Sequence, residues 1–260
     1  MKNYLEINRA LWDNRANHHF DSDFYDVPAF LAGKSSLKDI ELALLGDLTG
    51  KKVLHLQCHF GQDTLSLATM GAEVTGVDLS EVAIQKAREL AQQTGLEARF
   101  IASDVLTLDQ HLAEEFDLVF TSYGVIGWLP DLKPWGKIIA QFLKPGGHFI
   151  MAEFHPVIWM FDDQLKKLEY SYFNEELIIT TEAFSYAGAK EGLEAYGWNH
   201  SLADVFTVLL REGLSILDFQ EYNYSPYDIF EESVAVSNGF QVKGQKNIFP
   251  YVYSIKAAKQ

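Results

Sequence analysis

Short apolar runs alternate along this chain with segments in which apolar residues recur at helical spacing. Residues 53–56 predict a buried strand, and residues 63–70 predict a helix with its leucines turned inward. Strands that alternate with helices pair in parallel through right-handed crossovers, which places helices on both faces of the sheet. The pattern therefore predicts an α/β fold with a doubly wound sheet. The other expected strands are 73–77, 98–102, 116–120, 148–152, 214–222 and 251–257, and the other expected helices are 80–93, 132–143 and 201–211.

The pattern changes after Glu153. Residues 154–199 are rich in aromatic side chains, such as Trp159 and Phe184, and show little periodicity. We expect this segment to be an insertion that covers the open edge of a site, and the loop 223–246 to fold back over the same face. No repeat or linker marks a boundary, so we expect a single domain over residues 1–260. Its expected parts are an N-terminal helical cap at 1–34, a core at 35–153, the insertion at 154–199, and the C-terminal part of the sheet at 200–260.

The composition narrows the class of protein. The chain has 260 residues, a formal net charge of −15 and one cysteine. This charge would repel a phosphate backbone, and one cysteine cannot build a thiolate metal cage. No apolar run reaches the length of a membrane span. We therefore expect a cytoplasmic protein with no nucleic-acid partner, no membrane partner and no metal, and the oligomeric state stays open.

Polar residues follow the first three expected strands, at the edge where such sheets bind ligands. Gly61 lies in a loop that enters a helix directly, where backbone amides and the helix dipole suit a negative group. Asp78 ends the second strand, where a carboxylate can accept hydrogen bonds from both hydroxyls of a ribose. Asp104 follows the third strand, where a carboxylate can accept a hydrogen bond from the amine of adenine. The structural alternatives are a plain strand–helix turn at Gly61 and helix caps at the two acids.

Nicotinamide dinucleotide enzymes also place an acid after the second strand. Their loop has the pattern G-x-G-x-x-G, whereas residues 57–62 read QCHFGQ and hold one glycine. An NAD(P)-linked oxidoreductase is therefore the second hypothesis.

Taken together, the motifs resemble the class I S-adenosylmethionine (SAM)-dependent methyltransferases of the type 11/12 kind. The resemblance covers roughly residues 35–153 and implies a Rossmann-like, mostly parallel seven-stranded sheet whose last strand is antiparallel. It also implies SAM as the cofactor, S-adenosylhomocysteine as its product, and methylation of a small molecule. The chain departs from the family at His55, Gln57 and His59, which replace an acid and two glycines. The motifs are VLHLQCHFGQDT, VTGVDLS, ASDV, FDLVFTSYGVIGWLPDL and LKPGGHFIMAEFH.

The resemblance assigns parts of SAM to the loops after successive strands. The first loop binds the methionine end, the second binds the ribose and the third binds the adenine. The loop after the fourth strand forms the wall of the methyl-transfer channel. Tyr4 and Trp12 lie on an expected N-terminal helix that can close over the sulfonium, with simple packing of that helix as the alternative. The residues concerned are Gln57, Cys58, His59, Gly61 and Gln62 for methionine, Asp78 and Leu79 for ribose, Asp104 and Val105 for adenine, and Thr121 and Ser122 for the channel wall.

Two histidines are candidate general bases. His200 lies in a stretch that resembles the acceptor-facing segment of the family, and His155 follows the fifth strand. An imidazole titrates near neutral pH, and a structural role is the alternative for each. Methyl transfer depends mainly on in-line alignment, so a base is useful chiefly for a hydroxyl or phenol acceptor. The acceptor and the choice between O- and N-methylation stay open, and a SAM-binding protein without catalysis is a third hypothesis.

Overall fold

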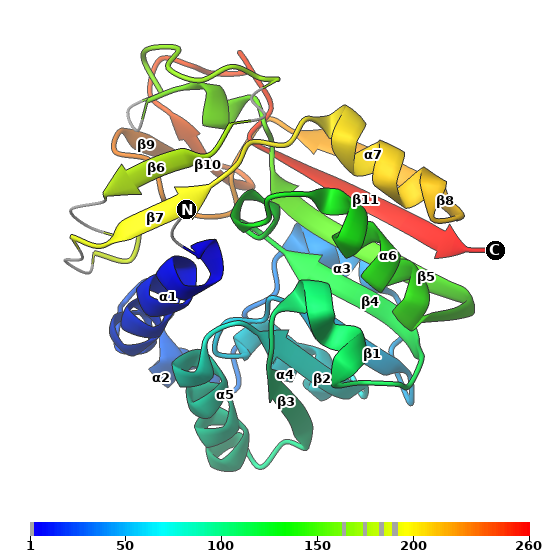
Figure 1. The fold of residues 1–260 in the computed structure, drawn as a ribbon. Coiled ribbons are helices and arrows are strands. Elements are labelled where there is room, and N and C mark those ends of the chain that lie inside the picture. The colour runs from blue at the N-terminus through cyan, green and yellow to red at the C-terminus, as the bar shows by residue number, and fades with distance from the viewer. Residues whose placement is uncertain (1–2, 163–164, 174–175, 182–184, 189–191) are drawn as a thin grey trace.

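A computed structural model describes residues 3–162, 165–173, 176–181, 185–188 and 192–260 (Figure 1). Its centre is a seven-stranded sheet of order β3-β2-β1-β4-β5-β11-β8. All neighbouring pairs are parallel except those of β11, which is antiparallel to both β5 and β8. The strands are β1 (Lys52–Leu56), β2 (Glu73–Asp78), β3 (Ala98–Ala102), β4 (Phe116–Ser122), β5 (Leu143–Phe154), β8 (Leu214–Tyr222) and β11 (Val252–Lys259).

Helices cover both faces of the sheet, so the predicted doubly wound fold is confirmed. One face packs against α3 (Asp39–Leu45), α4 (Gln62–Thr69) and α5 (Glu81–Thr94). The other face packs against η1 (Val105–Gln110), α6 (Leu132–Phe142) and α7 (Leu202–Arg211). The side chains of β1 explain the two layers, because Val53 faces the first group while Leu54 and Leu56 face the second.

Local sequence explains where several elements begin. Ser80 caps α5 as predicted, since its hydroxyl accepts the Ala83 N–H at 3.0 Å. Ser201 caps α7 in the same way, and the Asp204 carboxylate accepts the Ser201 N–H in return at 2.9 Å. β5 begins earlier than expected because Leu143 pairs with Phe116 before the Pro-Gly-Gly turn.

Several short elements were not predicted from the sequence. They include α2 (Val27–Leu31), α3, η2 (Ile126–Trp128) and η3 (Ile158–Met160). Two small antiparallel pairs also lie outside the main sheet, β6 (Ile178–Thr181) with β7 (Glu194–Gly197), and β9 (Ser233–Val236) with β10 (Gly239–Val242). These elements are too short to show a clear period, which explains why the pattern missed them. Phe184 of the expected insertion lies outside the described residues.

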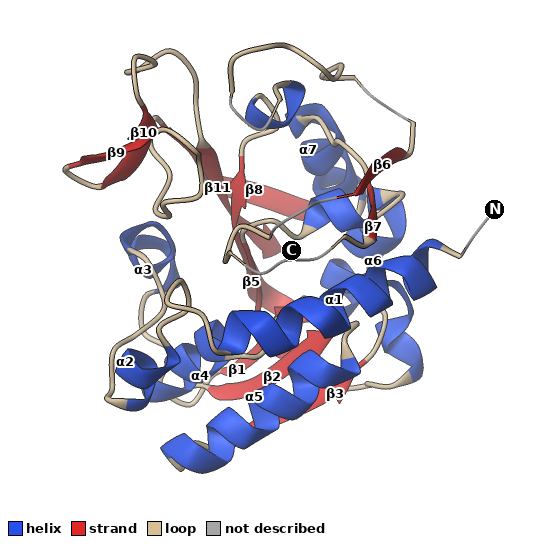
Figure 2. Ribbon diagram, turned by 90° about the vertical axis from the view of Figure 1, so that its left-hand side faces the viewer, coloured by secondary structure: helices blue, strands red, loops and turns tan. Residues whose placement is uncertain are grey.

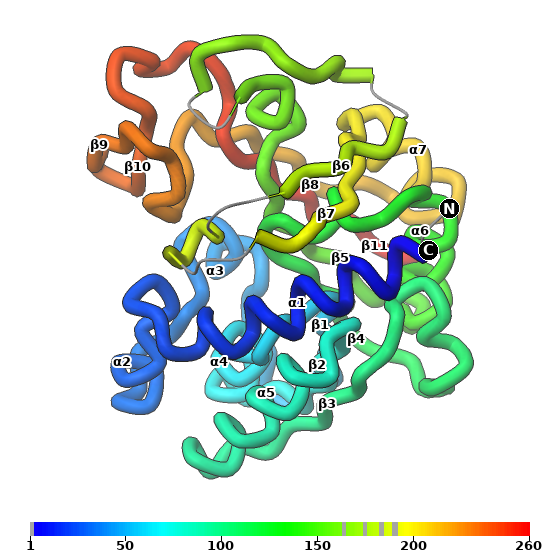
Figure 3. The backbone as a smooth tube through the Cα atoms, turned by 60° about the vertical axis from the view of Figure 1, so that its left-hand side comes forward, coloured from blue at the N-terminus to red at the C-terminus, as the bar shows by residue number. Residues whose placement is uncertain are grey.

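The N-terminal helix α1 (Tyr4–Phe20) runs beside α5 and meets β7 of the 154–199 segment (Figures 2 and 3). The buried Asn8 joins α1 to β7, because its amide donates to the Tyr196 carbonyl at 2.8 Å and its oxygen accepts the Tyr196 N–H at 3.0 Å. Asp13 joins α1 to the start of α5 by accepting the Ser80 hydroxyl at 2.6 Å. The helix is therefore fixed at two points beside the edge where β1 and β2 end.

Within the described ranges, no helix has both the length and the apolar character needed to cross a membrane.

Candidate cofactor and acceptor site

The loop after β1 keeps the backbone shape of a glycine loop although two of its left-handed residues carry side chains. Gln57, His59 and Gly61 have φ angles of 56°, 51° and 78°. The left-handed region is unfavourable for residues with a Cβ, so surrounding contacts must hold the loop there. Gln57 Nε2 donates to the Val125 carbonyl at 2.7 Å, and the His59 N–H donates to Asp78 Oδ2 at 2.8 Å.

Gly61 is required both by its φ angle and by close packing. A Cβ at this position would lie 2.7 Å from the ring of Phe100 and 3.0 Å from the Cβ of Ala87. The glycine therefore lets the loop approach β3 and α5 closely before the chain enters α4.

Asp78 connects the loops after β1 and β2. Its second oxygen, Oδ1, accepts the Ser80 N–H at 2.9 Å. Burial raises the pKa of Asp78 to about 6, although both backbone donors act in the opposite direction. Each carboxylate oxygen keeps a further lone pair that can accept a hydrogen bond.

Asp104 follows β3 and begins η1. Its Oδ1 accepts the Leu106 N–H at 3.0 Å, so the cap foreseen as the structural alternative is present. The acid also lies near α1: burial, followed by the charge of Asp104, raises the pKa of Tyr4. The ring of Tyr4 meets Trp198 edge-on at 5.5 Å.

Trp12 of α1 lies directly over the loop after β1. Its ring is 5.3 Å from the ring of His59 and 5.2 Å from the ring of Trp128, with edge-to-face geometry. The Arg15 guanidinium lies 5.1 Å from the centre of the Trp12 ring. The structure therefore brings together the predicted residues Trp12, His59 and Asp78 at one edge of the sheet.

Other predicted residues point away from this edge or are engaged elsewhere. The side chains of Cys58 and Val105 belong to the core, and the Cys58 N–H donates to the Val77 carbonyl at 2.9 Å. Thr121 is fully buried and its hydroxyl donates to the Leu56 carbonyl at 3.4 Å. Gln62 donates to the Tyr25 carbonyl at 3.0 Å and so fastens the connection between α1 and α2. Leu79 is half-buried beside Asp78.

A buried acid shapes the loop after β4. Glu153, at the end of β5, accepts the N–H groups of Gly124, Val125 and Ile126 at 2.5, 2.8 and 3.3 Å. Charge-assisted hydrogen bonds of this kind are stronger than neutral ones. Glu153 therefore fixes the loop to which the resemblance assigns the channel wall.

The two candidate histidines each make structural contacts. The ring of His155 pairs with Glu221 Oε1 at 2.9 Å through Nε2 and accepts the Val157 N–H at 3.2 Å through Nδ1. Nε2 of His200 lies 2.8 Å from the Leu129 carbonyl, at the end of the loop after β4. Burial lowers the pKa of both histidines. These contacts fit the structural alternative for both rings, and the role of either histidine as a general base stays a prediction.

Histidine also replaces the expected acid and one glycine of the loop after β1. His55 is buried, and its Nδ1 lies 2.8 Å from the Thr64 hydroxyl. His59 Nε2 lies 3.2 Å from Nδ1 of the buried His19, which comes from the last turn of α1. Burial lowers the pKa of His55 to about 4 and that of His19 to about 3, so both rings are neutral near pH 7.

A second group of polar side chains lies beside the loop, and the sequence analysis identified only Ser122 of this group. Asp63, the second residue of α4, accepts the hydroxyls of Ser36 at 2.6 Å and of the predicted Ser122 at 3.0 Å. Glu41 of α3 accepts the Tyr123 hydroxyl at 2.8 Å. The motif around Ser122 is a local signal for this region, but no local signal marks Glu41, because α3 is short.

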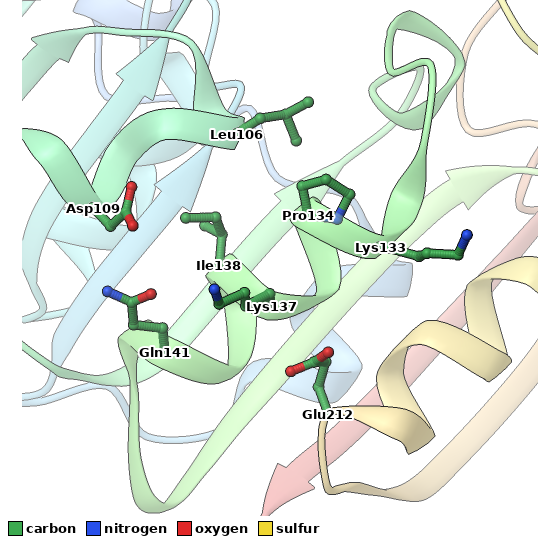
Figure 4. Close-up of a pocket in the computed structure, with 8 residues that line it drawn as sticks. All are labelled: Leu106, Asp109, Lys133, Pro134, Lys137, Ile138, Gln141 and Glu212. Carbon is green, nitrogen blue, oxygen red and sulfur yellow. The ribbon is translucent and has the colours of Figure 1, made fainter.

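Two surface grooves lie outside all of these residues. One runs between η1, α6 and the end of α7 (Figure 4). The other lies at the start of α3, against the 223–251 segment. The first groove is lined by Leu106, Asp109, Lys133, Pro134, Lys137, Ile138, Gln141 and Glu212.

In the part of the chain that the structure describes, no three side chains of the metal-binding types come together.

The fold and the site define the class of protein. Residues 47–200 match the family model described as a methyltransferase domain, and this match spans more than half of the chain. The chain therefore belongs to this methyltransferase family, and its sheet is that of the class I methyltransferases.

Individual relatives share parts of the chain. A ubiquinone biosynthesis O-methyltransferase from Photorhabdus laumondii is 34% identical over 107 residues, which are 41% of this chain and 44% of the relative. This chain thus spans less than half the length of the curated relatives it matches. A SAM-dependent methyltransferase from Mesorhizobium loti has a similar structure, with a TM-score of 0.56, 20% identity, and coverage of 88% of this chain and 100% of its own. Another from Clostridium acetobutylicum has a TM-score of 0.58 and 18% identity, and the match covers 97% and 98% of the two chains.

Proposed function

We propose that this protein transfers the methyl group of SAM to a small-molecule acceptor. The observation that carries the proposal is the edge formed by the loop 57–61, Asp78 and Trp12, within a chain that belongs to the methyltransferase family. The names of the curated relatives support an O-methylation, and those of the similar structures support SAM as the cofactor.

The residues present fit the cofactor. Gln57 Oε1 and His59 Nδ1 are buried and have no hydrogen-bond partner among the described residues, so both can serve a ligand. Asp78 and Asp104 each keep lone pairs for the ribose and the adenine, and main-chain groups of residues 57–61 would hold the methionine end. The ring of Trp12 suits a sulfonium cation.

The cofactor supplies a methyl group already activated by a positive sulfur. The protein's own contribution is to bind, to align the acceptor and to exclude water. Asn8 and Asp13 hold α1 over the site, and Glu153 holds the loop after β4. Because alignment contributes most of the rate, no single residue need be essential for chemistry.

A calorimetric titration with S-adenosylhomocysteine, beside one with NADH, tests this proposal. We expect binding of S-adenosylhomocysteine and none of NADH, because the loop lacks the glycines that a dinucleotide pyrophosphate needs. Formation of S-adenosylhomocysteine from SAM with a panel of phenols, alcohols, amines and carboxylates then separates an enzyme from a binding protein. Binding of NADH alone would contradict the proposal.

A further inference from the structure

Glu41 is a buried acid that the proposed function does not use. It has no exposed surface, and its carboxylate accepts the Lys38 N–H at 3.0 Å and the Tyr123 hydroxyl at 2.8 Å. A buried carboxylate is costly to keep ionised. Burial, followed by the charge of Asp63, raises the pKa of Glu41 to about 7. An acid with this pKa is suited to accept a proton at neutral pH.

Tyr123 brings this acid to the edge of the sheet where β4 ends. It is the first residue after β4 and has a φ angle of 28°, a conformation that bulky residues rarely adopt. Its N–H donates to the Ala152 carbonyl at 2.7 Å, which fixes its backbone. The neighbouring Ser122 contacts Asp63, which lies two residues beyond Gly61. The Tyr123 side chain is therefore fixed next to the loop that would hold the methionine end of the cofactor.

Aromatic side chains from distant segments surround Tyr123. The ring of Tyr227, from the loop after β8, meets the ring of Tyr123 edge-on at 5.1 Å. Tyr123, Tyr227 and Asp63 are half-buried, whereas Glu41 is not exposed. We therefore place the acceptor on the side of the tyrosines, with Tyr123 between it and Glu41.

The charges around Glu41 are mainly negative. Lys38 is one of the two lysines of this group, with its Nζ 4.7 Å from the centre of the Tyr227 ring. β5 presents the apolar Ile150 and Ala152 to α3. The other titratable groups that surround Glu41 are Asp39 of α3, Asp63 of α4, Tyr123, Tyr224, Tyr227 and, at the far end of α3, Lys256 of β11.

We propose that Tyr123 and Glu41 form a proton-accepting pair and that the acceptor is a neutral hydroxyl compound, a phenol or an alcohol. This inference rests on the proposed function. A carboxylate or thiolate acceptor needs no base and would be repelled by Asp63 and Glu41. A neutral amine needs no base to use its lone pair, whereas a hydroxyl becomes a good nucleophile only as it loses its proton.

The proposed step balances in atoms and electrons. The acceptor oxygen forms a bond to the methyl carbon, while sulfur keeps the electron pair of the bond that breaks. The acceptor proton passes to the Tyr123 oxygen as the Tyr123 proton passes to Glu41. Tyr123 is unchanged at the end, and Glu41 is protonated until it releases the proton to water. Burial, followed by the charge of Glu41, raises the pKa of Tyr123 well above its usual value, so the hydroxyl keeps a proton between turnovers.

The first test measures the proton on Glu41 without any acceptor. Infrared difference spectra of the whole protein with S-adenosylhomocysteine, wild type minus Glu41→Gln, report the protonated carboxyl group as pH changes. We expect this group to titrate near neutral pH and its band to shift in Tyr123→Phe, while the exposed Glu97→Gln control leaves the signal unchanged. A Glu41 that remains ionised down to about pH 5, close to the ordinary range of a glutamate, would overturn the proposal.

The second test measures kcat against pH, with the acceptor that gives the fastest formation of S-adenosylhomocysteine. We expect a hydroxyl compound to be that acceptor, and Glu41→Gln and Tyr123→Phe to lower kcat by about 100-fold with loss of the acidic limb of the profile. Affinity for S-adenosylhomocysteine should stay the same in both variants. A fall in kcat with an unchanged pH profile, or a preference for carboxylates, would overturn the pair. Failure of the wild type to bind S-adenosylhomocysteine would instead contradict the proposed function itself.

Discussion

The proposed cofactor side of this site is built from residues close together in the chain, whereas the proposed acceptor side is assembled from distant ones. Gln57, His59 and Gly61 lie in one loop whose backbone angles define its shape. Glu41, Tyr123 and Tyr227 come from three separate segments that meet only in the folded chain. A cofactor common to a whole family can be recognised by a short contiguous motif. The acceptor differs between enzymes, and the side chains that recognise it come from variable loops.

The two sides also differ in their ionisable groups. On the cofactor side, burial lowers the pKa of His19, His55 and His59 and keeps these rings neutral. On the acceptor side, burial raises the pKa of Glu41. Both shifts have the same cause, since a low-dielectric environment disfavours whichever form carries charge. The four predictions that follow compare the two sides with each other and with the surface outside them.

The largest effect is expected from Asp78→Asn. The change removes the carboxylate that we propose as the acceptor of the ribose hydroxyls and weakens the contact that holds the His59 N–H, so affinity for S-adenosylhomocysteine should fall by about 100-fold. Isothermal titration calorimetry measures this loss, and the exposed Asp109→Asn carries the same charge change as a control. Equal affinity in Asp78→Asn and the wild type would show that the cofactor side has been placed wrongly.

Asn8→Ala should destabilise the cap over the cofactor side. It leaves the N–H and carbonyl of Tyr196 without their partner in a buried position, which should cost about 2 kcal/mol in the free energy of unfolding. Urea denaturation measures this cost. Asn8→Asp keeps the acceptor and loses the donor, so its loss should be intermediate if α1 remains docked on β7. An unchanged unfolding free energy in Asn8→Ala would mean that α1 is not held by this contact.

The two sides should respond to pH with opposite sign. His19 has a lowered pKa, so its stabilising contribution is complete above its unfolded value of about 6.5 and is lost as pH falls toward about 3. Glu41 has a raised pKa, so its contribution is complete below its unfolded value of about 4.5 and is lost as pH rises through about 7.

Urea unfolding at several pH values between about 5 and about 8 measures how the free energy of unfolding depends on pH, and it separates the loss in acid from the loss on the alkaline side. His19→Gln should weaken the loss of stability in acid, and Glu41→Gln should weaken the loss on the alkaline side. The exposed His111→Gln serves as the control. If both variants changed the profile in the same direction, the contrast between the two sides would be incorrect.

The smallest effect is expected outside both sides. Glu114 forms surface ion pairs with Lys52 at 3.0 Å and Arg99 at 2.9 Å. Exposed ion pairs contribute little, so Glu114→Gln should change the unfolding free energy by less than about 1 kcal/mol and leave cofactor affinity unchanged. Thermal unfolding and calorimetry measure both quantities. A larger change would show that the sheet edge, far from the ligand, influences the site.

Much of the core fold could be predicted because its signals are local. Strand 98–102 and strand 214–222 were predicted with the bounds they have in the structure. The positions of the loop 57–61 and Asp78 at strand ends were also predicted, because strand ends and helix starts are marked by nearby residues, and their role in cofactor binding stays a prediction.

The acceptor side could not be predicted in the same way. Glu41 lies on a helix of seven residues, too short for a clear apolar period, and an isolated acid gives no hint of burial. His155 and His200 were attractive as bases because of their residue type, yet their ring nitrogens contact Glu221 and the Leu129 carbonyl. Only the packed structure shows which titratable groups have other partners.

The sequence by itself determined the order of the main strands and helices and the class of fold, and it predicted the edge at which a cofactor would bind, because these follow from periodicity and from residues close together in the chain. The tertiary structure decided that α1 closes against β7 and α5, that Gln57 and His59 hold a glycine-like loop, and that Glu41 lies behind Tyr123. The physical reason is that burial, and with it the protonation state of an acid or a histidine, depends on contacts between residues far apart in the sequence.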